Sequence, residues 1–112
     1  MNKKKELKEE YLQMKPNMGI FSICCKLNNK YYMEATQDLK SRMNRAVFQL
    51  KWGSHPNKEL QKDWNELGED NFTVEILDTL EYDKDESKID YTEDLTLLKM
   101  VWEEKLRDID LY

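Results

Sequence analysis

Residues 19–35 have the sequence GIFSICCKL-NN-KYYMEA, in which two β-prone runs flank the pair Asn28-Asn29. Gly19–Leu27 and Lys30–Ala35 are both rich in residues that favour strands, and the first run partly alternates apolar with polar side chains. Asparagine tolerates the positive φ of a type I′ turn better than most residues do. The stretch therefore predicts two antiparallel strands joined by a two-residue turn.

Helical periodicity follows the predicted hairpin. A helix is predicted from a cap at Thr36 or Asp38 to about Trp52, where Gly53 is placed to end it. Its apolar stripe consists of Leu39, Met43, Val47 and Leu50. A second, shorter helix, also followed by a glycine, is predicted over residues 57–67.

The remaining elements complete a small α+β domain. Residues 71–77 alternate apolar with polar side chains, which predicts a strand, and the acidic residues 81–90 predict a loop. Thr92 is expected to cap a last helix. The apolar face of that helix consists of Leu95, Leu98, Trp102 and Leu106. The order predicts a three-stranded antiparallel sheet flanked by helices over residues 17–112, preceded by a charged helix within residues 1–16.

Composition excludes several classes of protein. The 112 residues contain no apolar run near the roughly 20 residues that a membrane span needs. No secretory signal is visible at the first residues, so a cytoplasmic location is expected. Cys24 and Cys25 are adjacent and would point to opposite faces of a strand, and His55 is the only histidine, so no zinc site is expected. His55 is expected to be a surface residue in the loop between two helices.

Charge is distributed unevenly along the chain. The formal net charge is −5, but residues 19–62 carry a net charge of +5 and residues 63–112 carry −12. A basic stretch beside an acidic one can bind a polyanion on one face although the whole molecule is acidic. Solvated surfaces explain the same counts, so charge alone does not decide between these interpretations.

Two short motifs and one longer block resemble the GIY-YIG nuclease superfamily. Gly19-Ile20-Phe21 corresponds to the first motif, Gly-Ile-Tyr, and Tyr32-Met33-Glu34 corresponds to the second, Tyr-Ile-Gly. Arg42, ten residues after Tyr32, falls on the catalytic arginine of the family. Residues 53–77 are similar to a bacterial and phage branch, which points to a phage or mobile element as origin. The resemblance covers residues 17–106 and implies a GIY-YIG-like fold.

The resemblance also implies a chemistry for these positions. In the family the second-motif tyrosine, here Tyr32, helps to activate the attacking water, and the arginine, here Arg42, stabilises the phosphate. A glutamate on the last helix binds one divalent metal ion. Phosphodiester cleavage needs these groups because it requires a base near the water, a cation for the developing charge and an oxygen-ligated metal.

Three departures from the family pattern indicate a degenerate site. Phe21 lacks the hydroxyl of the first motif, and Glu34 places a carboxylate where the family has glycine. With the last helix aligned on Trp102, the metal-binding glutamate is replaced by Lys99, whose ammonium has no lone pair for Mg²⁺. Lys99 is expected to form an ion pair with Glu34 or Glu103 in place of the metal. No metal site and no cofactor are expected, and Mg²⁺ is implied only if cleavage is retained.

Three functions therefore remain open. The preferred one is a nuclease-like pseudo-enzyme that binds nucleic acid or a nucleotide-like ligand through the old active-site face. Besides Tyr32 and Arg42, the expected binding residues are Lys26, Lys30, Tyr31, Arg45 and Lys51. The second is an active, divergent metal-dependent endonuclease. The third is an acidic interaction or inhibitor protein whose C-terminal half docks on a basic partner protein.

Overall fold

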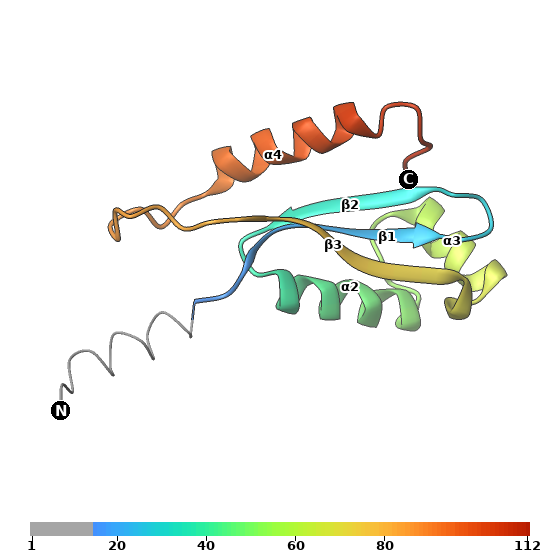
Figure 1. The fold of residues 1–112 in the computed structure, drawn as a ribbon. Helices are drawn as coiled ribbons and strands as arrows, with labels where there is room; N and C mark the ends of the chain where they lie inside the picture. The colour runs from blue at the N-terminus through green and yellow to red at the C-terminus, as the bar shows by residue number, and fades with distance from the viewer. Residues whose placement is uncertain (1–14) are drawn as a thin grey trace.

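Three antiparallel strands form the centre of the molecule (Figure 1). The structure is a computed structural model that describes residues 15–112, so the helix predicted within residues 1–16 lies almost wholly outside the described residues. Strand β1 (Met18–Cys25) lies between β2 (Tyr31–Thr36) and β3 (Phe72–Leu80) and pairs antiparallel with both. The predicted α+β class and the three-stranded sheet are confirmed.

The turn between β1 and β2 differs from the predicted two-residue type I′ turn. Pairing ends where the amide of Cys25 donates to the carbonyl of Lys30, so four residues form the connection. Only Asn29 among them has a positive φ, of 57°. The ladder ends early because the amide of Lys26 donates instead to the carbonyl of Asn71 beside β3, while the side chain of Asn28 accepts from the Lys30 amide. The predicted turn type is wrong because of these two contacts, and the Asn28-Asn29 pair by itself gives no sign of them.

Helices cover both faces of the sheet (Figure 1). Helices α2 (Leu39–Trp52) and α3 (Lys58–Leu67) pack on one face, and α4 (Thr92–Lys105) lies across the other. A short 3₁₀ turn, η1 (Glu69–Asn71), leads into β3. No helix within residues 15–112 is long and apolar enough to cross a membrane.

Side-chain and glycine caps define the helix ends. The Asp38 side chain accepts from the amide of Ser41 at the start of α2, which confirms one of the two predicted caps. Gly53 ends α2 in the left-handed conformation, with φ 75°. The prediction that Thr92 caps α4 is wrong: Tyr91 is the N-cap, and Asp90 accepts hydrogen bonds from both the amide and the hydroxyl of Thr92.

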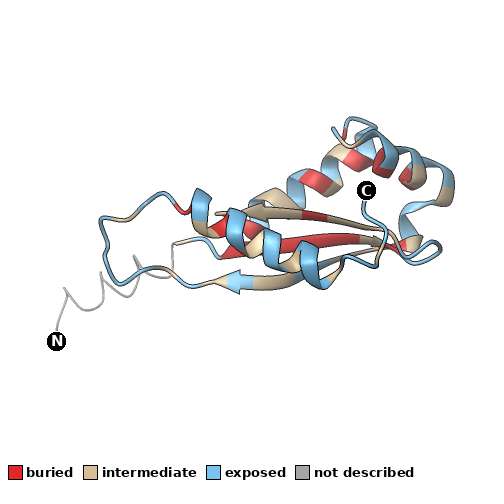
Figure 2. Cartoon of the chain, turned by 90° about the horizontal axis from the view of Figure 1, so that it is seen from above, coloured by how far each residue is buried: buried red, intermediate tan, exposed pale blue. Residues whose placement is uncertain are grey.

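Two apolar cores lie on opposite faces of β1, whose side chains are almost completely buried (Figure 2). The larger core lies under α2 and α3 and includes Phe21, Leu50 and Leu60. The smaller core joins Met18 to Tyr91 and Leu95 under α4. Because β1 pairs with β2 on one side and β3 on the other, β2 is an edge strand. Its residues are mostly half-buried, and its polar side chains reach solvent there.

Candidate functional site

Glu34 joins the two side chains that the sequence singles out, Tyr32 and Arg42. The Arg42 guanidinium donates two hydrogen bonds to the Glu34 carboxylate, at 2.7 Å from Nη2 and 3.2 Å from Nε. The Tyr32 hydroxyl donates to the same carboxylate at 3.3 Å. Tyr32 and Arg42 therefore lie on one half-buried surface, as predicted, but a third residue connects them.

The local structure explains why the side chains of Tyr32, Glu34 and Arg42 are in contact. Tyr32 and Glu34 are two residues apart on β2, so both side chains project from the same face of the strand. Arg42 lies one turn into α2, where its amide makes the first helical hydrogen bond to the carbonyl of Asp38. The cap at Asp38 thus sets the rotation of α2 and brings Arg42 over the edge strand.

His55 is the side chain that the sequence interpretation misplaced. It lies in the loop between α2 and α3, as expected, but it is only 6% exposed and not a surface residue. Its Nδ1 accepts from the amide of Asn57, and its ring lies edge-on to that of Tyr32, with centroids 5.1 Å apart. Its place in the block of residues 53–77 was the only sequence signal that it belongs to the site.

Burial and charge shift the pKa values of these groups. Burial, with a further contribution from the Glu34 carboxylate, raises the pKa of Tyr32 to about 12. The hydrogen bonds to Glu34 raise the pKa of Arg42 further above its ordinary value. Burial lowers the pKa of His55, so its imidazole is neutral at pH 7, and because Nδ1 accepts a hydrogen bond, Nε2 carries the proton. The site thus holds a phenol that stays protonated at pH 7, a charged guanidinium paired with a carboxylate, and a neutral imidazole.

Lys99 lies near the site without the expected ion pair. It lines a cavity of about 640 Å³ between β2 and α4 together with Glu34 and Glu103. It also lines a second cavity with Tyr32, so the alignment of α4 on Trp102 places position 99 beside the site. Across residues 15–112, however, none of the ion pairs involves Lys99. The predicted pair is wrong because Arg42, not Lys99, takes up the Glu34 carboxylate.

Two of the three residues of the first motif, Gly19 and Phe21, have structural roles. Gly19 lies where β1 approaches β3 so closely that an added Cβ would be 2.1 Å from the carbonyl oxygen of Asp78. The side chain of Phe21 is fully buried in the larger core. Phe21 has no hydroxyl to offer a substrate, and its buried ring stabilises the fold.

The five predicted binding residues fall into two groups. Lys26, Lys30 and Tyr31 lie at the hairpin, where Lys30 forms an ion pair with Glu59 and Lys26 donates to a backbone carbonyl. Arg45 and Lys51 are exposed on α2, on the far side of the larger core from the hairpin strands. The structure therefore does not gather all five into one patch, and their role in binding stays a prediction.

Known proteins resemble this chain in both sequence and structure. It is 36% identical over 67 residues to intron-associated endonuclease 1 of Enterobacteria phage T4, a match that covers 60% of this chain and 27% of that protein. The chain thus spans about a quarter of the length of this relative. No protein-family model matches the chain.

Two solved structures share the fold over most of its length. The catalytic domain of homing endonuclease I-TevI matches with a TM-score of 0.65 and 27% identity over 80% of this chain and 88% of that one. A mutant form of the catalytic domain of intron endonuclease I-TevI matches with a TM-score of 0.64, also at 27% identity, over 81% and 84%. With its sheet order, its glycine at position 19 and its clustered Tyr32 and Arg42, the chain belongs to the GIY-YIG nuclease superfamily.

Proposed function

We propose that this protein binds nucleic acid through the surface around Tyr32 and Arg42 and cleaves it poorly or not at all. The observation that carries the proposal is the two-bond contact between Arg42 and Glu34. An arginine that neutralises the charge building on a phosphate must be free to donate to it. Here a phosphate has to displace a carboxylate first, and that carboxylate repels it.

Glu34 also works against Tyr32 as an activating base. A tyrosine accepts a proton from water only as its phenolate, and a neighbouring carboxylate disfavours that anion. With a pKa of about 12, Tyr32 is protonated almost completely at pH 7. One substitution in the second motif therefore weakens both groups that the family chemistry needs.

The donors around Lys99 do not fit the divalent ion that the family implies. Both oxygens of Glu34 accept from Arg42, and Lys99 brings a positive charge into the cavity that Glu34 and Glu103 line. Among residues 15–112, no three histidine, cysteine, aspartate or glutamate side chains are grouped to hold a metal. Mg²⁺ prefers several oxygen ligands and no nearby cation.

Binding is tested by fluorescence anisotropy with labelled DNA and RNA, single-stranded and duplex, over a range of salt concentrations. We expect Arg42→Gln to weaken binding roughly tenfold, because it removes a positive charge from the surface and leaves the Glu34 carboxylate uncompensated, so that it repels phosphate more strongly. Arg107→Gln is the matched control, since Arg107 is exposed beyond α4 and pairs with Glu104. Glu34→Gln should strengthen binding, because it frees Arg42. No binding to any of these ligands, together with a tight complex with a basic protein, would favour the acidic interaction protein instead.

Cleavage is tested by plasmid nicking with Mg²⁺ and Mn²⁺. We expect little nicking by the unmodified protein and a gain for Lys99→Glu combined with Glu34→Gly, which restores the family residue types at both positions. The second candidate function, an active endonuclease, is favoured by the convergence of Tyr32, Arg42 and His55. Strong metal-dependent nicking that Tyr32→Phe abolishes would establish that alternative and contradict the proposal.

A further inference from the structure

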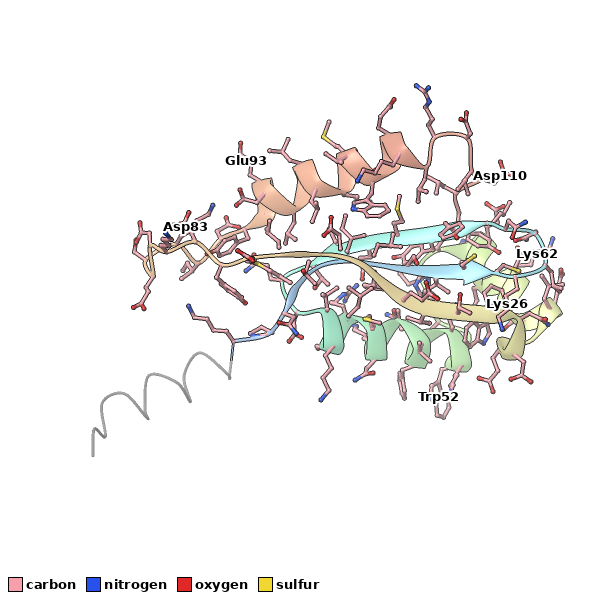
Figure 3. The ribbon with its side chains drawn as sticks, viewed as in Figure 1. Lys26, Trp52, Lys62, Asp83, Glu93 and Asp110 are labelled. Atoms are coloured by element: carbon pink, nitrogen blue, oxygen red, sulfur yellow. The ribbon has the colours of Figure 1, made fainter. Side chains whose placement is uncertain are left out.

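The outer face of α2 exposes two aromatic rings side by side. Phe48 and Trp52 are one helical turn apart and are 60% and 74% exposed. Their ring centroids lie 5.8 Å apart with an interplanar angle of 43°. Figure 3 shows Trp52 pointing from α2 away from the sheet. Neither ring contributes to the core, whose α2 residues lie on the opposite side of the helix.

The same face is positively charged in a molecule that is negatively charged overall. Helix α2 contains no aspartate or glutamate, whereas α3 and α4 each contain several. Its exposed cations include Lys40, Arg45 and Lys51. Lys51 makes only a 3.9 Å surface contact with Glu69, and neither of the other two forms an ion pair with any residue from 15 to 112.

This combination fits a ligand that offers both phosphates and flat aromatic surfaces. Exposed aromatic side chains bind unpaired bases by stacking, and nearby lysine and arginine side chains bind the backbone. A duplex offers only its phosphates to such a face, because its bases are already stacked and paired. A basic face with two exposed rings therefore favours a single strand over a duplex.

We propose that the outer face of α2 binds single-stranded nucleic acid, with unpaired bases stacked on Phe48 and Trp52 and phosphates contacted by Arg45 and Lys51. The inference rests on the proposed function and names its substrate class. Arg45 is one turn from Arg42 on the same helix. A strand held on this face would therefore extend toward the candidate site.

The test compares a labelled 20-nucleotide oligo(dT) with a duplex of the same length. We expect Trp52→Ala and Phe48→Ala each to weaken oligo(dT) binding roughly tenfold and to leave duplex binding within about twofold. Trp52→Tyr should retain most of the affinity, because it keeps an aromatic ring. Met100→Ala is the matched control, since Met100 is 59% exposed on α4, across the sheet from α2. All positions are exposed, and thermal melts verify that each variant is folded.

The outcomes separate this inference from the proposed function. If Arg42→Gln weakens binding while Trp52→Ala leaves oligo(dT) binding unchanged, the α2 face is not the binding surface and the proposed function stands. If the unmodified protein binds neither oligonucleotide and no RNA, both proposals fail. If Trp52→Ala instead dissociates an oligomer, measured by analytical ultracentrifugation, and does not alter binding, the face is an interface between copies and the inference is wrong.

Discussion

Glu34 accepts hydrogen bonds from both Arg42 and Tyr32, so a single carboxylate changes what two neighbouring groups can do. A glycine at this position would leave space in front of Arg42. The glutamate fills that space, compensates the positive charge of the Arg42 guanidinium in an ion pair, and disfavours the Tyr32 phenolate. Sequence comparison with the family identifies the substitution, but only the geometry shows that the new carboxylate is directed at Arg42 and not at Lys99.

His55 gives a pH dependence that can be isolated because the chain has no other histidine. Its pKa is lowered in the folded protein, chiefly by burial, so near and below pH 6.5 the unfolded chain binds more protons than the folded one. The free energy of unfolding should therefore fall as the pH decreases from 7.5 to 5.5. Urea unfolding at both pH values measures the change.

The variant His55→Asn serves as the control for this prediction. Its side-chain oxygen takes the place of Nδ1 and keeps an acceptor for the Asn57 amide. Its stability should differ less between the two pH values than that of the unmodified protein, because no side chain with an ordinary pKa in this range remains. Equal stability of the unmodified protein at pH 7.5 and 5.5 would contradict the account.

At the scale of the elements, the sequence predicted most of what local patterns determine, with the cap at Thr92 as the exception. The cap at Asp38, the C-terminal glycine of α2 and the extent of α3 follow from residues adjacent in the chain, and each agrees with the structure. The turn at Asn28-Asn29 and the burial of His55 depend on partners far along the chain, Asn71 and Tyr32 respectively. Neither partner can be identified from a local pattern, which is why the turn type and the burial of His55 beside Tyr32 were not predicted.

The close approach of β1 to β3 at Gly19 predicts a large effect of a small substitution. In Gly19→Ala the new Cβ would lie 2.1 Å from the backbone oxygen of Asp78, so the strands must separate. We expect a loss of about 1–3 kcal/mol in the free energy of unfolding, measured with urea. Gly53→Ala is the comparison, because nothing lies within 4 Å of its Cβ and only the left-handed φ of 75° is strained. A smaller loss for Gly19→Ala than for Gly53→Ala would contradict this reading of the strand contact.

On the scale of the whole molecule, the sheet separates regions of different charge. The basic helix α2 lies under one face, and α4, with four acids and two lysines, lies over the other (Figure 1). Net charge alone therefore misrepresents how the protein meets a polyanion. A ligand approaching from the α2 side meets cations first, and the acids of α4 lie behind the sheet.

The last three residues, 110–112, contact both the edge strand β2 and helix α3. Leu111 forms a parallel bridge with Tyr31, and the amide of Tyr112 donates to the carbonyl of Tyr31. The Tyr112 hydroxyl donates to the Asp63 carboxylate on α3 at 2.6 Å, and its ring packs against the larger core. These contacts occupy backbone groups at the start of β2 that an edge strand otherwise leaves open.

Two variants of Tyr112 separate its hydrogen bond from its packing. Tyr112→Phe removes only the bond to Asp63 and should lower the free energy of unfolding by about 1 kcal/mol. Tyr112→Ala also removes the ring from the core and should lower it by about 3 kcal/mol, measured by urea denaturation. Asp63→Asn, alone and combined with Tyr112→Phe, completes a double-mutant cycle. A coupling energy near zero would mean that the hydroxyl contact does not hold the C-terminal residues on α3. A cost for Tyr112→Ala no greater than that for Tyr112→Phe would mean that the ring adds nothing to the core, contrary to its packing against it.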